Sequence, residues 1–309
     1  MIDTAYLWIG FNVFVLLMLA LDLGVFHRKA HEVNIKEAVI WSAVWITLAL
    51  IFNYGVYLYM GKVKALEFFT GYILEKSLSV DNIFVFILVF SFFKVPSKYQ
   101  HKILFWGILG ALVMRVILIF SGVALLTKFH WLIYVFGAFL IFTGIKMLIQ
   151  KEQQIAPDKN ILVRLFKKIY PVTDVYHQDK FFVKIDGKRL ATPMFVVLLV
   201  IEFTDLIFAV DSIPAILAIT NDTFIVYTSN VFAILGLRAL YFALAGVMKY
   251  FRFLKIGLSV ILVFVGAKMC LVDFFKFPIS LSLGIIISIL LISVLASLIK
   301  PDKEVPGNI

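Results

Sequence analysis

Long runs of apolar residues, separated by short polar segments, divide the chain from end to end. Ala38 to Met60 is 23 residues without a charged side chain, and Pro278 to Ile299 is another 22. Because about 20 apolar residues span a bilayer as a helix, each run predicts one crossing. The pattern predicts an all-α polytopic membrane protein with about nine transmembrane helices, at residues 5–26, 38–60, 66–93, 103–122, 130–149, 192–217, 223–247, 252–272 and 278–299.

Composition and charge support this class. The chain is 62% hydrophobic with a mean hydropathy of +1.02, and only 16% of its residues are charged, against about a quarter in a soluble domain. If the N-terminus lies outside, 20 Lys and Arg fall in the inner segments and 4 in the outer ones. This bias follows the positive-inside rule. The excess of positive charge is therefore interpreted as a sign of topology and not of a nucleic-acid partner. We expect a multi-pass protein of the cell (inner) membrane that contacts lipid, with its N-terminus outside and its C-terminus in the cytoplasm.

The remaining polar features restrict the function less. A lone Cys270 permits no intrachain disulfide and no thiolate zinc site. The first span is not expected to be a cleavable signal peptide, because no Lys or Arg precedes it. The long connection at 150–191 is predicted to be a solvated cytoplasmic linker, with a short hairpin over 181–190 that turns at Asp186-Gly187. Nothing in the sequence predicts the oligomeric state.

An internal repeat organises the chain. Three anchors recur in the same order at offsets of 130, 123 and 122 residues: Ser79–Ile83 with Ala209–Ile213, Leu112–Arg115 with Leu235–Arg238, and Gly144–Met147 with Gly266–Met269. Each copy has three spans, an odd number, so the second copy enters the membrane from the opposite side. Inverted repeats of this kind are typical of secondary transporters, whose sites lie near the midplane at the repeat interface.

The repeat sets the predicted domain boundaries. Two three-helix units, one inverted relative to the other, are flanked by extra helices. We expect an N-terminal two-helix segment at 1–65, a first repeat at 66–149, the cytoplasmic loop at 150–191, a second, inverted repeat at 192–275, and a last helix with a short tail at 276–309.

Charged residues inside the spans are the main candidates for function. The spans hold six acids and three mid-span bases: Asp22, Glu75, Asp81, Glu202, Asp205, Asp211, Lys76, Arg115 and Arg238. A charge at the bilayer centre costs roughly 2.5–3.5 kcal/mol, so these side chains must face one another, a cation or water. The surplus of acids over bases predicts that carboxylates bind protons or hold a cation.

Helical spacing relates some of these residues. Glu202 and Asp205 are three apart and share a face. Glu75 with Asn82, and Asp205 with Ser212, are seven apart and also share faces. Asp81 and Asp211 fall off those faces in a regular helix. Either they address a second groove or the helix is distorted, and in the second copy Pro214 favours distortion.

The bases have two interpretations. Arg115 and Arg238 occupy equivalent repeat positions, and together with Lys76 they are interpreted as counter-ions that hold their helices against carboxylates. A sharper hypothesis is that the arginines replace the metal when the site is empty. Asp22, near the inner end of its span, is either interfacial or part of the site.

Ligand type restricts the metal. The five histidines lie in loops or at span ends, so the core offers carboxylate, amide, hydroxyl and backbone oxygens. Such sites suit Mg2+, Ca2+ and Mn2+, whereas Zn2+ and copper favour imidazole and thiolate. We expect no permanently bound cofactor. The predicted metal ligands are Glu75, Asp81, Asn82, Glu202, Asp205, Asp211, Ser212 and Asp22.

Two charged signatures resemble a known family. Glu75–Asn82 and Glu202–Ala215 resemble the paired signatures of the TerC/Alx family, and Ala20–Phe26 looks like its first span. The similarity covers roughly residues 3 to 275. The resemblance implies Mn2+ export from the cytoplasm, with proton exchange as a means of coupling, and it implies that the acids named above take part.

Three alternatives stay open. A Ca2+/H+ exchanger would use the same ligand chemistry. An intramembrane aspartyl hydrolase would use two facing acids, Asp81 and Asp211, but the sequence has no Gly-x-Gly-Asp context and too many acids. A membrane-assembly scaffold without transport would tolerate neutralisation of the acids. The favoured hypothesis is a secondary transporter for Mn2+, not an enzyme.

Overall fold

Nearly all of the described chain is helical, as the apolar runs predict. The computed structural model describes residues 4–24, 35–129, 131–149, 166, 168–173, 175–185, 187–245, 253–275 and 277–299, and within these ranges it leaves out the side chains of residues 4, 5, 20–24, 81, 84 and 245. The elements are α1 (Thr4–Gly24), α2 (Ile35–Met60), α3 (Lys62–Phe92), α4 (Ser97–Lys128), α5 (Leu132–Ile149), β1 (Phe182–Ile185), β2 (Lys188–Ala191), α7 (Pro193–Leu217), α8 (Thr223–Leu235), α9 (Leu237–Ala245), α10 (Leu254–Cys270) and α11 (Ile279–Ile299).

Each predicted span coincides with a helix, but not all of these helices are long and apolar enough to cross a membrane. Six stretches are long and apolar enough to span a membrane: α2, α4, α5, α7, α11 and the stretch Thr223–Leu244 formed by α8 and α9. The other three predicted spans fall on α1, α3 and α10. The chain is thus an all-α polytopic membrane protein, while the count of nine crossings and the inverted repeat stay predictions.

One predicted span differs from its helix. The run 223–247 is predicted as a single helix, yet it is divided at Gly236 into α8 and α9. The Lys76 ammonium lies beside Gly236, within 2.7 Å of where a Cβ would project, and donates to the carbonyl of Ala233 at 3.1 Å. The Lys76 cation thus takes up a carbonyl of the last turn of α8, where the helix ends.

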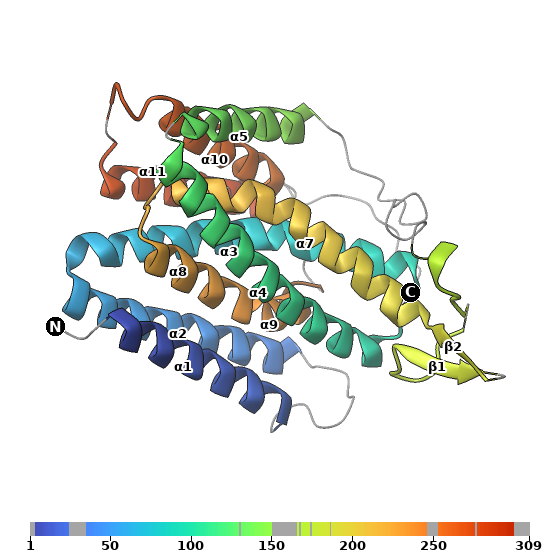
Figure 1. Cartoon of the computed structure of the whole chain (residues 1–309). Coiled ribbons are helices and arrows are strands. Elements are labelled where there is room, and N and C mark those ends of the chain that lie inside the picture. The colour runs from blue at the N-terminus through green and yellow to red at the C-terminus, as the bar shows by residue number, and fades with distance from the viewer. Residues whose placement is uncertain are drawn as a thin grey trace.

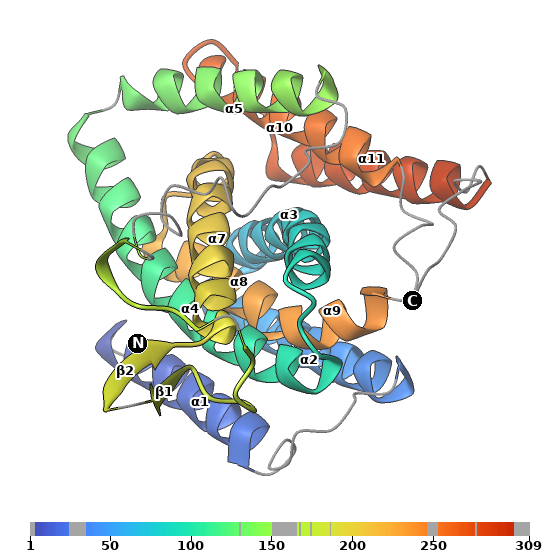
Figure 2. The same cartoon turned by 90° about the vertical axis from the view of Figure 1, so that its right-hand side faces the viewer.

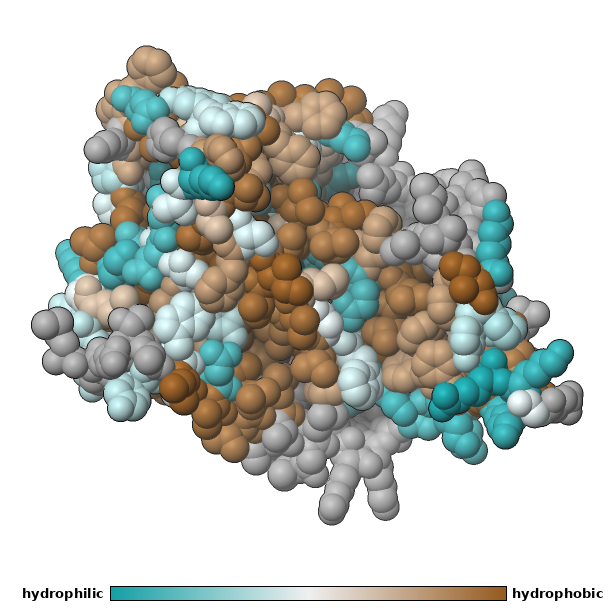
Figure 3. Space-filling view, in the orientation of Figure 1, coloured by the Kyte–Doolittle hydropathy of each residue, from teal (hydrophilic) through white to brown (hydrophobic). Residues whose placement is uncertain are grey.

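The helices form three groups, with α3 and α7 in the middle (Figures 1 and 2). Helices α1 and α2 lie on one side, and α5, α10 and α11 lie on the other. Around the central pair, α4 packs against α7, and α8 packs against α3. Figure 3 shows apolar side chains across the middle of the visible face and hydrophilic ones toward its ends, as expected for a surface that faces lipid.

Glycines bring α5 and α10 into close contact. A Cβ at Gly266 would lie 2.6 Å from the carbonyl oxygen of Gly137, and one at Gly144 would lie 2.7 Å from that of Ser259. Small residues at these positions let the two backbones touch, which is a common way to associate helices in membranes. Residue numbers rise along α5 from Gly137 to Gly144 while those of the contacted residues in α10 fall from Gly266 to Ser259, so the two helices run antiparallel.

The loop before α7 folds into a docked hairpin. Strands β1 and β2 pair antiparallel and turn through Gly187, whose φ of +76° suits a residue without a side chain. This agrees with the predicted hairpin. The hydroxyl of Tyr176 donates to the carbonyl of Phe93 at 2.9 Å, and Lys102 pairs with Asp179 at 2.8 Å, which holds the pKa of that carboxyl below its ordinary value. The described part of the predicted linker is therefore anchored to the ends of α3 and α4.

Candidate metal centre

A buried arginine joins the two central helices. Arg115 of α4 is 2% exposed, and its Nη1 donates to Oε1 of Glu75 on α3. The guanidinium also donates to the Asp205 carboxylate of α7, from Nε at 3.3 Å and from Nη2 at 3.2 Å. Nη1 lies 3.3 Å from Oδ1 of Asn230 on α8. One positive charge thus faces two carboxylates, and the pair keeps a net negative charge when both are ionised.

Small residues on α4 explain how the arginine reaches α7. A Cβ at Gly107 would lie 3.1 Å from Ile201, and one at Gly122 would lie 3.1 Å from Leu217. A Cβ at Gly110 would overlap the carboxylate of Glu202. These glycines line the side of α4 that faces α7, so the two helices approach closely. The arginine between them therefore spans a short gap.

A small cavity lies beside the ion pairs. It has a volume of about 50 Å³, which is enough for an ion with a few water-sized neighbours. It lies among α3, α4, α5, α7 and α10, which come from both predicted repeats. Its lining residues are Glu75, Leu78, Asn82, Arg115, Thr143, Met147, Phe208, Asp211, Ser212 and Leu262.

Three oxygens on the lining residues are buried without a hydrogen-bond partner among the described residues. They are Oε2 of Glu75, Oδ1 of Asn82 and Oγ of Ser212. The Asn82 amide donates through Nδ2 to Asp205 at 3.1 Å, which leaves its oxygen as the unused atom. An unsatisfied buried polar group costs about 1–3 kcal/mol. Three of them around one cavity indicate a place for a cation or for water.

Comparison with known proteins identifies the family. The chain matches the Integral membrane protein TerC family over residues 60–304. It belongs to the TerC family. The chain is 55% identical to the membrane protein STKORF319 of Myxococcus xanthus, with 95% of this chain and 92% of that protein covered. The TerC resemblance predicted from the charged signatures is therefore confirmed.

Other relatives carry a more specific name. This TerC protein is 49% identical to a protein of Salmonella typhi named membrane-bound redox modulator Alx, and 48% identical to the one of the same name from Escherichia coli K12. In each case the alignment covers 94% of both chains. No solved structure matches the chain.

The structure brings together half of the predicted ligands. Glu75, Asn82, Asp211 and Ser212 line the cavity, and Asp205 lies next to it, held by Arg115 and Asn82. Asp211 also accepts a hydrogen bond from Thr143 of α5 at 3.2 Å. Of the residues grouped by sevens, Glu75, Asn82 and Ser212 line the cavity, whereas Asp205 does not.

Other predicted residues lie elsewhere. Glu202 packs against Gly110 of α4 and does not line the cavity, although it shares α7 with Asp205. Lys76 donates to the backbone carbonyl of Ala233 and pairs with no carboxylate among the described side chains. Arg238, 7% exposed, lies in the first turn of α9. The side chains of Asp22 and Asp81 lie outside the described residues.

Carboxylates alone do not form the site. Among the described side chains, no three of the His, Cys, Asp and Glu residues gather as a metal-binding group. Because the side chains of Asp22 and Asp81 lie outside the described residues, the predicted ligand set as a whole stays a prediction. Amide and hydroxyl oxygens, from Asn82 and Ser212, complete the donor set around Glu75 and Asp211.

The position of Asp211 answers the question of helix geometry. Helix α7 runs without interruption from Pro193 to Leu217, with Pro214 in its last turn. Asp205 contacts α4 while Asp211 contacts α5. A regular helix that presents its two acids to different neighbours accounts for this arrangement, so distortion between the acids is not needed.

Two polar residues of the site are missed by the sequence reasoning. Asn230 contacts the guanidinium of Arg115, and Thr143 contacts Asp211. Both stand inside apolar spans, Asn230 directly after Thr228-Ser229 and Thr143 directly before the Gly144–Met147 anchor. A search for uncharged polar residues within the spans would have found them.

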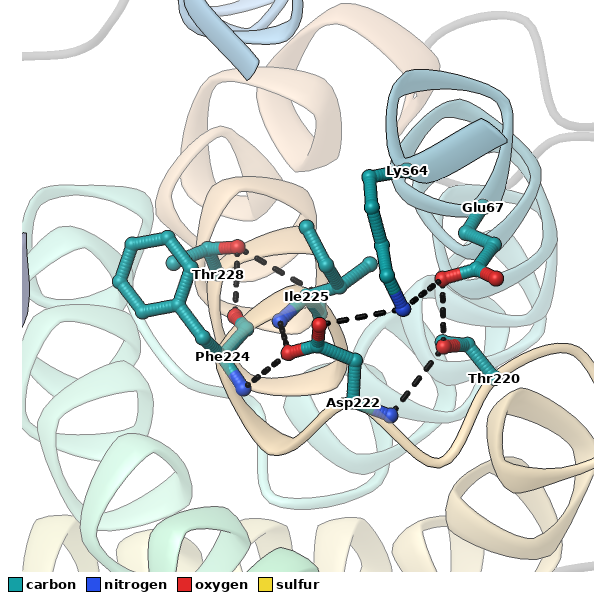
Figure 4. A network of polar contacts seen from close by, with 7 residues as sticks. All are labelled: Lys64, Glu67, Thr220, Asp222, Phe224, Ile225 and Thr228. Atoms are coloured by element: carbon teal, nitrogen blue, oxygen red, sulfur yellow. Dashed lines mark hydrogen bonds and ion pairs between the residues drawn. The ribbon is translucent and has the colours of Figure 1, made fainter. Parts of the chain in front are cut away.

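A second polar network ties α3 to the turn between α7 and α8 (Figure 4). Lys64 pairs with Glu67 at 2.8 Å and with Asp222 at 3.1 Å. Glu67 also accepts a hydrogen bond from Thr220 at 2.6 Å. Asp222 caps α8 by accepting from the backbone nitrogens of Phe224 and Ile225, so one lysine links the start of α3 to the start of α8.

We expect Lys64→Gln to destabilise the protein by about 1–3 kcal/mol, because it leaves the buried Glu67 without its cation. Thermal unfolding in detergent measures the change. Lys62→Gln removes an equally charged but exposed residue from the same end of α3 and should change the free energy of unfolding by no more than about 0.5 kcal/mol. Equal melting temperatures for the two variants would contradict a structural role for this network.

Proposed function

We propose that this TerC-family protein is a secondary transporter that exports a divalent metal ion, Mn2+ first, from the cytoplasm. The ion would bind in the cavity between α3 and α7, and protons would be the coupling ion. The observation that carries the proposal is the set of three unpartnered buried oxygens, on Glu75, Asn82 and Ser212, that surrounds this cavity together with Asp211.

The donor set supports a hard cation. Two carboxylates, an amide oxygen and two hydroxyls line the cavity, and none of the cavity residues that the structure describes is a histidine or a cysteine. Oxygen sites of this kind suit Mn2+, Ca2+ and Mg2+. Protonation of Asp211 or Glu75 would weaken the hold on the ion, which gives a physical route by which protons release it.

The helix contacts support alternating access through an inverted repeat. Under the predicted correspondence, α3 is equivalent to α7, and α4 is equivalent to α8. The contact of α3 with α8 is then the counterpart of the contact of α4 with α7, and both are present. Repeats related in this way rock around a midplane site in many secondary transporters, and the cavity takes residues from both units.

The name of the Alx relatives suggests a different role. A redox function of this chain through thiol–disulfide exchange would need a second molecule, because Cys270 is the single cysteine in the sequence. Neither this role nor a membrane-assembly scaffold accounts for a cavity lined by unpartnered oxygens. Both remain outcomes of the transport experiment below.

We expect the purified protein in liposomes to move Mn2+, and Asp211→Asn to lower the transport rate at least about tenfold through the loss of one ligand charge. Release of Mn2+ is followed with a fluorescent metal indicator. Asp179→Asn is the matched control, because it removes an acid that is half-exposed in the loop. It should transport at the wild-type rate.

The outcome separates the candidate functions. Transport of Ca2+ but not of Mn2+ would support the transporter with its cavity and would show that Ca2+, not Mn2+, is its substrate. Equal rates for Asp211→Asn and wild type would remove the cavity from the mechanism. If the wild-type protein moves neither ion under a pH gradient of either sign, the transporter proposal fails and the scaffold function becomes the leading candidate.

A further inference from the structure

Helix α5 contributes two neighbouring side chains to the cavity. Thr143 and Met147 are four residues apart, one turn of helix, and both line the cavity. Thr143 donates to the carboxylate of Asp211 at 3.2 Å. The face of α5 that carries both residues is therefore turned toward an acid of the proposed metal site, and Met147 is part of the same wall.

Met147 supplies the one sulfur among the ten lining residues. The other described lining residues are five with side-chain oxygens, the guanidinium of Arg115, and three hydrocarbons, Leu78, Phe208 and Leu262. A thioether is a soft, polarisable donor that binds transition metals better than it binds Mg2+ or Ca2+. A donor of this kind gives a hard-oxygen site a means to discriminate among divalent ions.

We propose that Met147 sets the ion preference of the cavity, favouring Mn2+ and the softer Cd2+ over Ca2+ and Mg2+. The inference rests on the proposed function and deepens it, since oxygen donors alone leave Mn2+ and Ca2+ undecided. It assigns to α5 a role that neither charged signature contains.

Coordination numbers explain the direction of the preference. Ca2+ takes six to eight oxygen ligands, and Mg2+ keeps several of its waters. The described cavity residues include five with side-chain oxygens, Glu75, Asn82, Thr143, Asp211 and Ser212, and one with a thioether, Met147. The thioether adds nothing to the oxygen shell that Ca2+ and Mg2+ need, whereas an ion that accepts sulfur gains a ligand from it.

The repeat provides an internal comparison. The anchors Gly144–Met147 and Gly266–Met269 each end in methionine. Met269 of α10 is 1% exposed and packs against Gly137 at the crossing with α5, and it does not line the cavity. The same motif therefore places one methionine in the core and the other at the proposed ion site.

The test is equilibrium binding of Mn2+, Ca2+ and Cd2+ to the purified full-length protein in detergent. Met147→Leu keeps the apolar bulk and removes the sulfur, and it should lower the preference for Mn2+ over Ca2+ about tenfold and weaken Cd2+ binding by a similar factor. Met147→Gln places an oxygen on a side chain of similar length and should shift the preference further toward Ca2+. Met269→Leu is the matched control and should leave all three affinities unchanged.

The results separate the inference from the proposed function. Wild-type binding of Mn2+ with an unchanged Mn2+/Ca2+ ratio in Met147→Leu overturns the role of Met147 alone. Equal shifts in Met147→Leu and Met269→Leu also overturn it, because both would then act through packing. A wild-type protein that binds none of the three ions overturns both the metal site and the inference.

Discussion

Arg115→Gln is expected to cost about 3–5 kcal/mol of folding stability, because removal of one partner leaves buried carboxylates without a counter-charge. The arginine is 2% exposed and bonds to both Glu75 and Asp205. The measurement is the melting temperature in detergent, without metal, at neutral pH. The melting temperature of Arg115→Lys should lie between those of wild type and Arg115→Gln, since an ammonium keeps the charge but lacks the planar guanidinium that contacts several oxygens.

Added Mn2+ distinguishes the two interpretations of this arginine. If Arg115 stands where a cation otherwise binds, Mn2+ should raise the melting temperature of Arg115→Gln by more than that of wild type, because binding to the folded state stabilises it. If Arg115 is only a structural counter-ion, Mn2+ should shift both proteins equally. An unchanged melting temperature for Arg115→Gln without metal would show that the two carboxylates are already neutral.

Gly266→Ala is expected to destabilise the protein by about 3 kcal/mol, because the added methyl group meets backbone rather than a movable side chain. The new Cβ would lie 2.6 Å from the carbonyl oxygen of Gly137 and 2.9 Å from the backbone nitrogen of Ile141. To relieve the overlap, α5 and α10 must separate along their whole crossing. Tryptophan fluorescence during thermal unfolding measures the loss.

Gly284→Ala is the matched control for this change. It lies in α11, and a Cβ there meets nothing within 4 Å. Alanine favours helix over glycine by about 1 kcal/mol, so the control should raise the melting temperature slightly. We therefore expect the melting temperature to fall for Gly266→Ala and to rise for Gly284→Ala. A gain for Gly266→Ala as well would mean that the two helices do not touch at this point.

Much of the helical layout follows from the sequence because membrane helices are set by local composition. Each predicted apolar run coincides with helix, although α4 extends six residues beyond its run at each end, and Asp186-Gly187 located the hairpin because its turn needs φ above zero. The break at Gly236 was not predictable in this way. Apolar residues continue across it, and Lys76 of another helix takes up a carbonyl there, which is a tertiary contact.

The candidate site was predictable only as far as one helix determines it. The spacing of Glu75 and Asn82 correctly placed them on one face, toward one cavity. The same reasoning joined Glu202 to Asp205, but two residues on adjacent edges of a face can meet different neighbours. Glu202 met a glycine of α4, and Asp205 met its arginine. Both residues face α4, so what differs is the residue of α4 that each side chain meets, and single-chain periodicity carries no information about it.

The crossing of α5 and α10 has the reciprocity of a subunit interface. Gly137 meets Gly266 and Gly144 meets Ser259, and at the repeat offset of 122 residues Gly144 corresponds to Gly266 and Gly137 to Ser259. The predicted repeat therefore converts each contact into the other, as the two-fold axis does in the isologous interface of a dimer. Because both halves belong to one polypeptide, this association does not depend on protein concentration and is not lost on dilution.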